Sequence, residues 1–327
     1  MKDILSDTKL KNTTLKYMTG EVESMSKKLP NLLIVGAAKC GTSSLHKYLD
    51  QHPHIFMSKV KEPRFISSQV NPFPLNGPGD HKVEAWYVKD YEGYTKLFEG
   101  SEGYPVVGES SADTLYFYKR TIPVIKQYHG DPKIIIMLRN PVKRAFSAYQ
   151  HLVRDLREEL SFEDGLREEP NRIRDNWELI YHYTAASLYY DSVKAFLDNF
   201  SSVKIILTED QEKTPQLVLR DIFRFLDVDP NFDVNTEIRY NMSGKPKSQW
   251  LHQFFFEGNV ARKFAQPIVR TLFSRETRMR IAQKIQEKNL TRLSINPDTK
   301  RRLQQYFEED IRKMERLLNR DLSVWRK

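Results

Sequence analysis

The segment NLLIVGAAKCGTSSLHKYL, residues 31–49, constrains the fold more than any other part of the chain. An apolar run ends at Gly36, a second glycine follows at Gly41, and a helical pattern rich in hydroxyl side chains comes next. A buried strand that enters a helix through a glycine-rich loop presents backbone N–H groups to an anion at the helix N-terminus. The segment therefore predicts an α/β protein with a phosphate-binding loop.

The loop differs from the usual triphosphate-binding loop in the position of its lysine. The usual pattern is G-x-x-x-x-G-K-[ST], in which the lysine follows the second glycine. Here Thr42 stands at that position, and Lys39 lies inside the loop, before Gly41. An ordinary strand–turn–helix connection with a surface lysine is the alternative. We expect the phosphate contacts to come from Lys39, Cys40, Gly41, Thr42, Ser43 and Ser44.

Strand and helix patterns alternate along most of the chain. Apolar runs typical of buried parallel strands occur at residues 32–35, 105–108, 133–138 and 203–207, with a short one at 54–57. Helical patterns lie at residues 43–51, 141–155, 184–199 and 216–226, and Asn140 with Pro141 forms a favourable helix start. After Trp250 the patterns are helical only. This alternation predicts a three-layer α/β/α fold with a mainly parallel central sheet and additional C-terminal helices.

The domain prediction is simple. Residues 1–28 are polar and predict a tail or a loose helix, whereas residues 29–327 predict a single domain whose part 250–327 is helical and basic. The proline- and glycine-rich stretch NPFPLNGPGD, residues 71–80, is the best candidate for a mobile lid.

Charge is distributed unevenly. The net charge of the chain is +9. Residues 245–327 have 20 basic and 9 acidic side chains and so carry +11, whereas the rest of the chain sums to −2. Such a region suits an anionic ligand, an acidic polymer or a membrane surface, although an ordinary solvated helical face has the same composition. We expect no nucleic-acid partner.

Compartment and membrane association follow from two further features. The single cysteine, Cys40, excludes an intrachain disulfide and is compatible with a reducing compartment. No apolar run approaches the roughly 18 residues that a membrane span needs, and the N-terminus lacks a signal-peptide core. We therefore expect a soluble, cytoplasmic protein without a transmembrane segment.

A second motif is KIIIMLRNPVKRAFSAYQHLV, residues 133–153. Arg139 closes the predicted strand, and Ser147 lies about two turns into the following helix. A guanidinium and a hydroxyl in these places can hold a phosphate together. A structural ion pair of Arg139 is the alternative.

Together the two motifs closely resemble the sulfotransferase superfamily, whose members use 3′-phosphoadenosine-5′-phosphosulfate (PAPS) as donor. The first resembles the 5′-phosphosulfate loop of the family, and the second resembles its 3′-phosphate site. KVKEPRFI (59–66) is similar to the segment that carries the acidic base in the carbohydrate, heparan-type branch, and VVGESSADTLY (106–116) to the next active-site strand. YNMSGKPKSQW (240–250) resembles the basic loop that closes over the cofactor. Ser110 stands where heparan-type enzymes often have a lysine, so the acceptor contacts of that branch are not carried over. We expect no membrane anchor before the domain, unlike in the Golgi members, so the bacterial soluble members are the better comparison.

The resemblance implies roles for individual residues. Lys39 would stabilise charge on the oxygen that bridges sulfur and the 5′-phosphate. Glu62 would be the base for the acceptor, with Glu109 as the second candidate, and either could act while the other orients a side chain. Arg139 and Ser147 would hold the 3′-phosphate, and Lys245 and Lys247 would contact the cofactor phosphates. The product would be adenosine 3′,5′-bisphosphate, and no metal would be required.

The predicted function is sulfuryl transfer from PAPS to a hydroxyl or amine, with a saccharide or small molecule as acceptor. A nucleotide or sugar kinase with a divergent loop is one alternative, disfavoured by the missing G-K-[ST]. A non-catalytic module that binds acidic polymers is another. The joint presence of Lys39, Glu62, Arg139 and Ser147 disfavours it.

Overall fold

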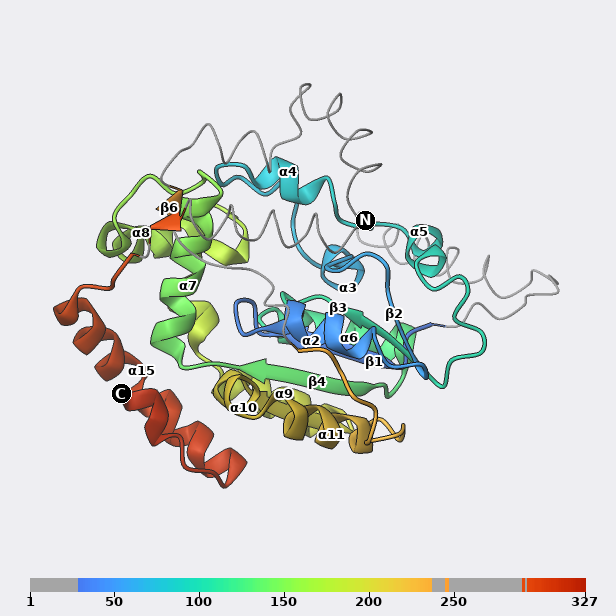
Figure 1. Cartoon of the computed structure of the whole chain (residues 1–327). Helices are drawn as coiled ribbons and strands as arrows, with labels where there is room; N and C mark the ends of the chain where they lie inside the picture. The colour runs from blue at the N-terminus through green and yellow to red at the C-terminus, as the bar shows by residue number, and fades with distance from the viewer. Residues whose placement is uncertain (1–28, 237–244, 247–289, 292) are drawn as a thin grey trace, which may run out of the picture.

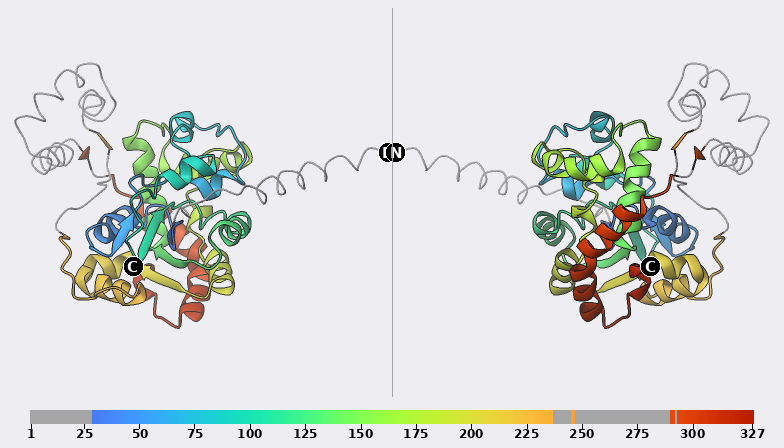
Figure 2. Two further views of the ribbon diagram at one scale, coloured as in Figure 1. Left: turned by 90° about the vertical axis from the view of Figure 1, so that its right-hand side faces the viewer. Right: turned by 90° about the vertical axis from the view of Figure 1, so that its left-hand side faces the viewer.

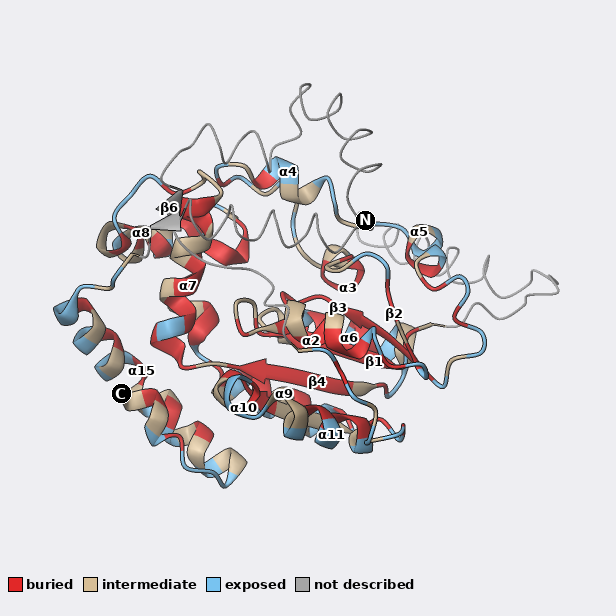
Figure 3. Ribbon diagram, viewed as in Figure 1, coloured by how far each residue is buried: buried red, intermediate tan, exposed pale blue. Residues whose placement is uncertain are grey.

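The computed structural model describes residues 29–236, 245–246, 290–291 and 293–327. Its centre is a five-stranded sheet of order β2-β3-β1-β4-β5 in which every neighbouring pair is parallel. The strands are β1 (Leu32–Gly36), β2 (Ile55–Met57), β3 (Val106–Ser110), β4 (Lys133–Leu138) and β5 (Val203–Leu207). The sheet is buried on both faces (Figure 3), as expected for parallel strands made of continuous apolar runs.

Helices pack on both faces of this sheet, so the predicted three-layer α/β/α fold is confirmed (Figure 1). The α-helices are α2 (Thr42–Leu49), α3 (Phe65–Ser68), α4 (Asp80–Glu84), α5 (Tyr91–Lys96), α6 (Tyr118–His129), α7 (Pro141–Arg154), α8 (Phe162–Arg174), α9 (Tyr190–Asn199), α10 (Thr208–Lys213), α11 (Pro215–Phe225) and α15 (Pro297–Leu318). Short 3₁₀ turns are η1 (Leu179–Tyr181), η2 (Ala185–Ser187) and η3 (Ser323–Arg326).

Several predicted bounds hold to within a residue or two. The strand 133–138 and the strand 203–207 appear as β4 and β5 with the predicted limits. Helix α7 begins as predicted: the Asn140 side chain accepts from the Lys143 N–H at 3.1 Å, and Pro141 occupies the first helical position. Strand β3 extends two residues beyond the prediction, to Ser110, so Glu109 lies within it.

Two predictions of secondary structure were wrong. Residues 184–199 do not form one helix, because Leu188 is extended and α9 begins at Tyr190. The Asp310 carboxylate accepts from the backbone N–H groups of Tyr189 and Tyr190 at 2.9 and 3.1 Å and thereby fixes this start. The pattern after Trp250 is not helical only, because β7 (Leu290–Thr291) pairs antiparallel with β6 (Lys245–Pro246).

The order of the strands places the site. After β1 the chain forms β2 and β3 on one side of it and then crosses to form β4 and β5 on the other. Connections that diverge in this way leave a crevice at the carboxyl ends of the strands, which is where open α/β sheets bind ligands. The loop after β1 and the start of α7 after β4 lie at this end of the sheet (Figure 1).

The C-terminal segment covers the flank of this end. Helix α15 contacts α7 and α9 and crosses the surface of the molecule in Figure 2. Trp325, which is fully buried, accepts at its carbonyl from the Asn140 side chain at 2.8 Å and contacts Glu209 through its ring N–H at 3.3 Å. The chain end is therefore fastened to the residue that follows Arg139.

The basic character of the C-terminal region is partly neutralised where the structure describes it. In α15, Arg312 pairs with Glu308 at 2.7 Å, and Arg326 of η3 pairs with Glu315 at 2.7 Å. The predicted tail 1–28 and residues 251–289 lie outside the described residues, so polymer or membrane contact by the basic region stays a prediction, as does the single domain. No helix among the described residues is both long and apolar enough to cross a membrane.

Candidate active site

The loop between β1 and α2 is shaped by its two glycines. A Cβ on Gly36 would lie 2.7 Å from the Leu115 Cβ and 3.0 Å from the Ala112 carbonyl oxygen, so only glycine fits there. Gly41 has φ = 93° and precedes the first turn of α2. Lys39 also has a positive φ, 72°, which is unfavourable for a side chain and typical of functional loops.

Groups outside the loop hold its carbonyl oxygens. Arg144 donates to the Ala38 carbonyl at 3.1 Å, and the Thr208 hydroxyl donates to the Cys40 carbonyl at 2.7 Å. The backbone N–H groups of Ala38, Lys39, Gly41, Thr42 and Ser43 have no hydrogen-bond partner in the part of the chain that the structure describes. A loop with its carbonyls bonded outward and its amides free is suited to an anion.

Cys40 is an exception among the predicted loop contacts. Its side chain is fully buried against the Tyr189 hydroxyl, at 3.7 Å, and its own N–H donates to the Ala37 carbonyl at 3.1 Å. Burial raises the pKa of the thiol to about 11. Cys40 thus supports the loop from inside rather than offering a group to a ligand.

Cations gather around Lys39. Lys39 as a whole residue is half-buried, and burial followed by the nearby Arg154 charge lowers its pKa from 10.5 to about 7, with smaller effects of Arg144 and Arg139. Asp155 opposes this shift, but it is engaged by Arg154 at 2.8 Å. The cluster of Lys39, Arg139, Arg144 and Arg154 therefore has a surplus of positive charge that an anionic ligand would relieve.

Helix α7 supplies two of these four cations, Arg144 and Arg154, from one face. Arg144, Ser147, His151 and Arg154 are spaced three or four residues apart and so lie along one side of the helix. The Lys39 charge helps to lower the pKa of His151, after burial, which places the imidazole near the loop. Arg144, His151 and Arg154 were not predicted as site residues, although their spacing from Ser147 is a signal that could have found them.

The predicted phosphate clamp starts from two neighbouring elements. Arg139 follows β4 directly, and its guanidinium lies 3.4 Å from the Lys39 carbonyl. The backbone carbonyl of Arg139 accepts from the Tyr189 hydroxyl at 3.0 Å. Ser147 is 7 % exposed, and its hydroxyl has no hydrogen-bond partner among the described residues. Among them Arg139 also has no carboxylate partner, so the structural ion pair weighed from the sequence is absent there.

Glu62 is held against the end of β3. Its N–H donates to the Ser110 carbonyl at 2.9 Å, and its carboxylate accepts from the Ala112 N–H at 2.8 Å. Lys61 forms an ion pair with the same carboxylate, and the Arg64 Nε lies 3.6 Å from it. Burial alone would raise the pKa of Glu62, but these cations and hydrogen bonds outweigh it and lower the pKa below the usual 4.5. Glu62 is therefore ionised at neutral pH.

Glu109 has the opposite protonation state. It is 2 % exposed, and burial, with the neighbouring Glu62 and Asp113 charges, raises its pKa to about 8. The Ser111 hydroxyl, 2.8 Å from the Glu109 carboxyl, also accepts from the Arg64 N–H at 3.0 Å. Ser111 thus links Glu109 to the backbone of Arg64, whose side chain lies beside Glu62. Of Glu62 and Glu109, only Glu62 carries a charge at pH 7.

The donor loop and the acidic residues lie close together. The backbone of Ala112 lies between them: its N–H donates to Glu62 at 2.8 Å, and its carbonyl oxygen would lie 3.0 Å from a Cβ on Gly36 of the loop. The structure thereby brings the loop, Arg139, Glu62 and Glu109 to one end of the sheet. Lys245 lies in β6, which contacts α7, and nothing is described of its side chain; Lys247 lies outside the described residues.

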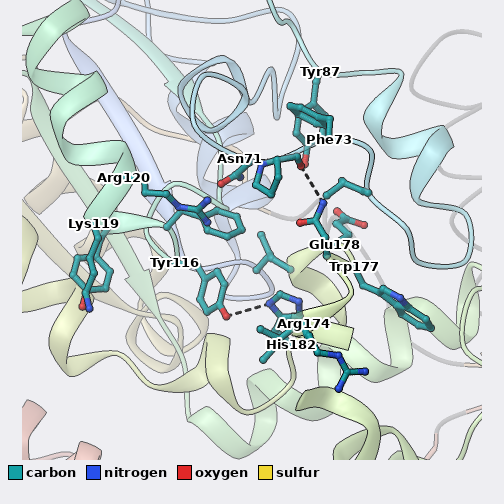
Figure 4. Close-up of a pocket in the computed structure, with 17 residues that line it drawn as sticks. Asn71, Phe73, Tyr87, Tyr116, Lys119, Arg120, Arg174, Trp177, Glu178 and His182 are labelled. Carbon is teal, nitrogen blue, oxygen red and sulfur yellow. Dashed lines mark hydrogen bonds between the residues drawn. The ribbon is translucent and has the colours of Figure 1, made fainter. Parts of the chain in front are cut away.

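A cavity of about 500 Å³ (Figure 4) is linked to Glu62 through Arg64, because its wall residues Tyr87 and Glu178 both accept from Arg64, whose Nε lies 3.6 Å from Glu62. Its walls come from residues 71–75 of the predicted lid 71–80, from the segment that leads into α6, and from the segment between α8 and η1. The lid residues therefore line a cavity next to the candidate site.

Comparisons with known proteins agree with this geometry. A model of the sulfotransferase family matches residues 30–233, which include the loop, both acidic residues and the clamp. The chain belongs to the sulfotransferase family. The similar structure of a sulfotransferase from Alicyclobacillus acidocaldarius has a TM-score of 0.73 and 36 % identity, and the match covers 92 % of this chain and all of that one.

Curated sulfotransferases are also similar over part of their length. Membrane-associated sulfotransferase kil1 of Dictyostelium discoideum is 32 % identical over 154 residues, or 44 % of this chain and 29 % of that protein. Bifunctional heparan sulfate N-deacetylase/N-sulfotransferase 1 of Caenorhabditis elegans is 28 % identical over 233 residues, or 68 % of this chain and 25 % of that protein. This sulfotransferase-family chain thus matches only about a quarter of the length of these relatives.

Proposed function

We propose that the protein transfers a sulfuryl group from PAPS to a hydroxyl or amine of a saccharide or small molecule, without a metal ion. The observation that carries the proposal is the adjacency of a cation-rich loop with free amides and an ionised carboxylate, Glu62. Family membership and the heparan sulfate enzymes among the relatives support the reaction class and the saccharide acceptor.

The donor half of the mechanism follows from the loop. The loop amides, Thr42, Ser43 and Ser44 would hold the 5′-phosphosulfate, and Arg139 with Ser147, assisted by Lys245 and Lys247, would hold the remaining phosphate. As the bond between sulfur and the bridging oxygen breaks, its electron pair moves onto that oxygen. Lys39, protonated in the presence of the anion, stabilises the charge that develops there.

The acceptor half uses the ionised acid. The acceptor oxygen or nitrogen forms the new bond to sulfur, and its proton passes to the Glu62 carboxylate. Glu109, neutral at pH 7, is unsuited to take a proton but can donate a hydrogen bond, so we assign it an orienting role beside Glu62. We place the enzyme in the cytoplasm, since its one cysteine, Cys40, is a buried thiol.

The test is a transfer assay combined with a binding assay. The protein is incubated with sulfur-labelled PAPS and a panel of glycan, phenol and lipid acceptors, and the labelled product is separated. Calorimetry compares adenosine 3′,5′-bisphosphate with ATP and Mg²⁺ as ligands. Label transfer and selective bisphosphate binding are expected. Selective binding of ATP with Mg²⁺ would identify a kinase, and bisphosphate binding without transfer to any acceptor would favour a non-catalytic module.

A further inference from the structure

The cavity beside the site has the chemistry to select one class of acceptor, an inference that rests on the proposed function. It adjoins the donor loop, because Tyr116 and Leu179 line both this cavity and a smaller one bounded by Ala37 and Ala38. Its volume of about 500 Å³ falls in the range of roughly 300–1,000 Å³ that small-molecule sites occupy.

The cavity is also connected to the acidic residues. Glu178 is part of its wall and accepts from Arg64 at 2.8 Å, and Arg64 in turn lies 3.6 Å from Glu62. Tyr87, another wall residue, accepts from Arg64 at 2.7 Å. A molecule in this cavity would therefore lie between the loop and the supports of Glu62.

Aromatic rings form much of the wall, and several are fixed. The Tyr116 hydroxyl lies 3.1 Å from the His182 Nδ1 (Figure 4), and Phe73 packs edge-on against Tyr87 with ring centroids 5.6 Å apart. Phe117 and Trp177 add two further rings. Flat rings, whether aryl groups or the C–H faces of pyranoses, fit such walls.

The charges in the wall are predominantly positive. Lys119 and Arg120, in the first turn of α6, are exposed wall residues, and neither has a carboxylate partner within the described residues. Arg120 lies over the Phe117 ring at 5.0 Å and donates to the Val70 carbonyl at 3.2 Å, so its position is defined.

The other charged wall residues are compensated. The Glu178 carboxylate is neutralised by Arg64 and by Arg157, at 2.8 and 2.9 Å. Arg174 is paired with Asp175 at 3.0 Å. The two cations at the start of α6 are thus the charges in this wall that are left for a ligand.

We propose that this cavity is the acceptor site and that it takes a hydroxylated ring carrying an acid group, which Lys119 and Arg120 bind while the aromatic walls hold the ring. The acceptor hydroxyl then faces Glu62. The ring acid can be a uronic acid or an aryl carboxylate, and both share the chemistry that the wall recognises.

The test measures binding without turnover. The protein is saturated with adenosine 3′,5′-bisphosphate and titrated with two matched pairs: nitrophenyl β-glucuronide against the β-glucoside, and hydroxyphenylacetate against hydroxyphenylethanol. The acid of at least one pair should bind roughly three- to tenfold more tightly, as two exposed ion pairs allow. Preference in the glycoside pair alone indicates a saccharide acid, and preference in the phenol pair an aryl acid. The preference should shrink at high salt.

Three variants locate the effect. Lys119→Gln with Arg120→Gln should abolish the preference for the acid, whereas Lys126→Gln, which removes one positive charge near the far end of α6, should keep it. Phe73→Ala should weaken both members of each pair. All variants should bind the bisphosphate as the wild type does.

Contrary results separate the two proposals. Equal binding of acid and neutral members, no binding of any probe to the bisphosphate-loaded protein, or a preference that survives in the double variant would overturn the acceptor site alone. Failure of the wild type to bind the bisphosphate would overturn the proposed function itself.

Discussion

The candidate site has two halves, a basic one around the loop and an acidic one at the end of β3, and like charges lie close together in both. The two halves differ in how these charges are compensated. Around the loop, burial and the charges of Arg139, Arg144 and Arg154 together lower the pKa of Lys39, and these side chains leave a positive surplus. At the end of β3, Glu62 and Glu109 are also close, but cations hold one ionised while burial keeps the other neutral. The charges of the acidic half are compensated within the protein, whereas the positive charge of the basic half is compensated only when an anion binds.

The largest effect is expected from the acidic half. Glu62→Gln keeps the shape of the side chain but cannot accept a proton, and general-base catalysis contributes about 10²–10⁴ in rate. Turnover should fall by that order, whereas the affinity for adenosine 3′,5′-bisphosphate should stay almost unchanged. Initial rates with labelled PAPS and calorimetry with the bisphosphate measure the two quantities.

Glu109→Gln is the matched control for this assignment. Because Glu109 is neutral at pH 7, its amide replacement should affect turnover far less. Its raised pKa means that the folded protein keeps a proton which the unfolded chain loses between about pH 4.5 and 8, so wild-type stability falls across that window. The melting temperature of Glu109→Gln should fall less over the same pH range. If Glu109→Gln is folded but inactive while Glu62→Gln is fully active, Glu109 is the base and Glu62 the orienting residue.

Next in size is the loss of the loop cation. Lys39→Ala should lower turnover by on the order of 10²–10³, the usual effect of removing one electrostatic contact to a transition state. It should not lower the melting temperature, because the substitution removes a charge that burial and the neighbouring arginines disfavour. Turnover close to the wild-type value would contradict the role of Lys39 at the bridging oxygen.

The positions of many elements that build the two halves of the site could be predicted from local sequence. The loop, the ends of β4 and β5 and the helix start at Asn140 are set by residues adjacent in the chain, and the structure places them as predicted. The acidic candidates came from resemblance, and the structure adds what sequence could not supply. Which of Glu62 and Glu109 is charged depends on Lys61, Arg64 and burial, and therefore on distances across the fold.

The failures have the same origin. The break before α9 depends on Asp310, more than a hundred residues away, and no pattern within 184–199 reveals it. The burial of the Cys40 thiol depends on Tyr189, from the same distant segment. The arginines of α7 were within reach of helical spacing, but only the structure shows that they surround Lys39.

A smaller effect is expected at the clamp. Arg139→Ala removes a charged hydrogen bond worth about 1.5–3 kcal/mol, so the affinity for adenosine 3′,5′-bisphosphate should fall roughly ten- to a hundredfold. The affinity for adenosine 5′-monophosphate, which lacks the 3′-phosphate, should change little. Titration of both proteins with both ligands tests this, and an equal loss for the two ligands would place Arg139 elsewhere on the donor.

The smallest effect concerns protons and examines the basic half without altering the site. In the free protein the pKa of Lys39 is about 7, and a bound phosphate anion raises it again, because the cluster is no longer uncompensated. Binding of the bisphosphate near pH 8 should therefore take up close to one proton, and the affinity should fall as pH rises above 7, by at most about tenfold per unit. Calorimetry in buffers of different ionisation enthalpy counts the proton. Lys39→Met should abolish the uptake, whereas Lys126→Gln should retain it.

Since the unfolded chain holds this proton up to pH 10.5, the free energy of unfolding should also rise between pH 7 and 10.5 in the wild type and less in Lys39→Met. Binding at pH 8 without proton uptake would mean that Lys39 is already protonated in the free protein, with its charge compensated by Asp155. The two halves of the site would then not differ as proposed.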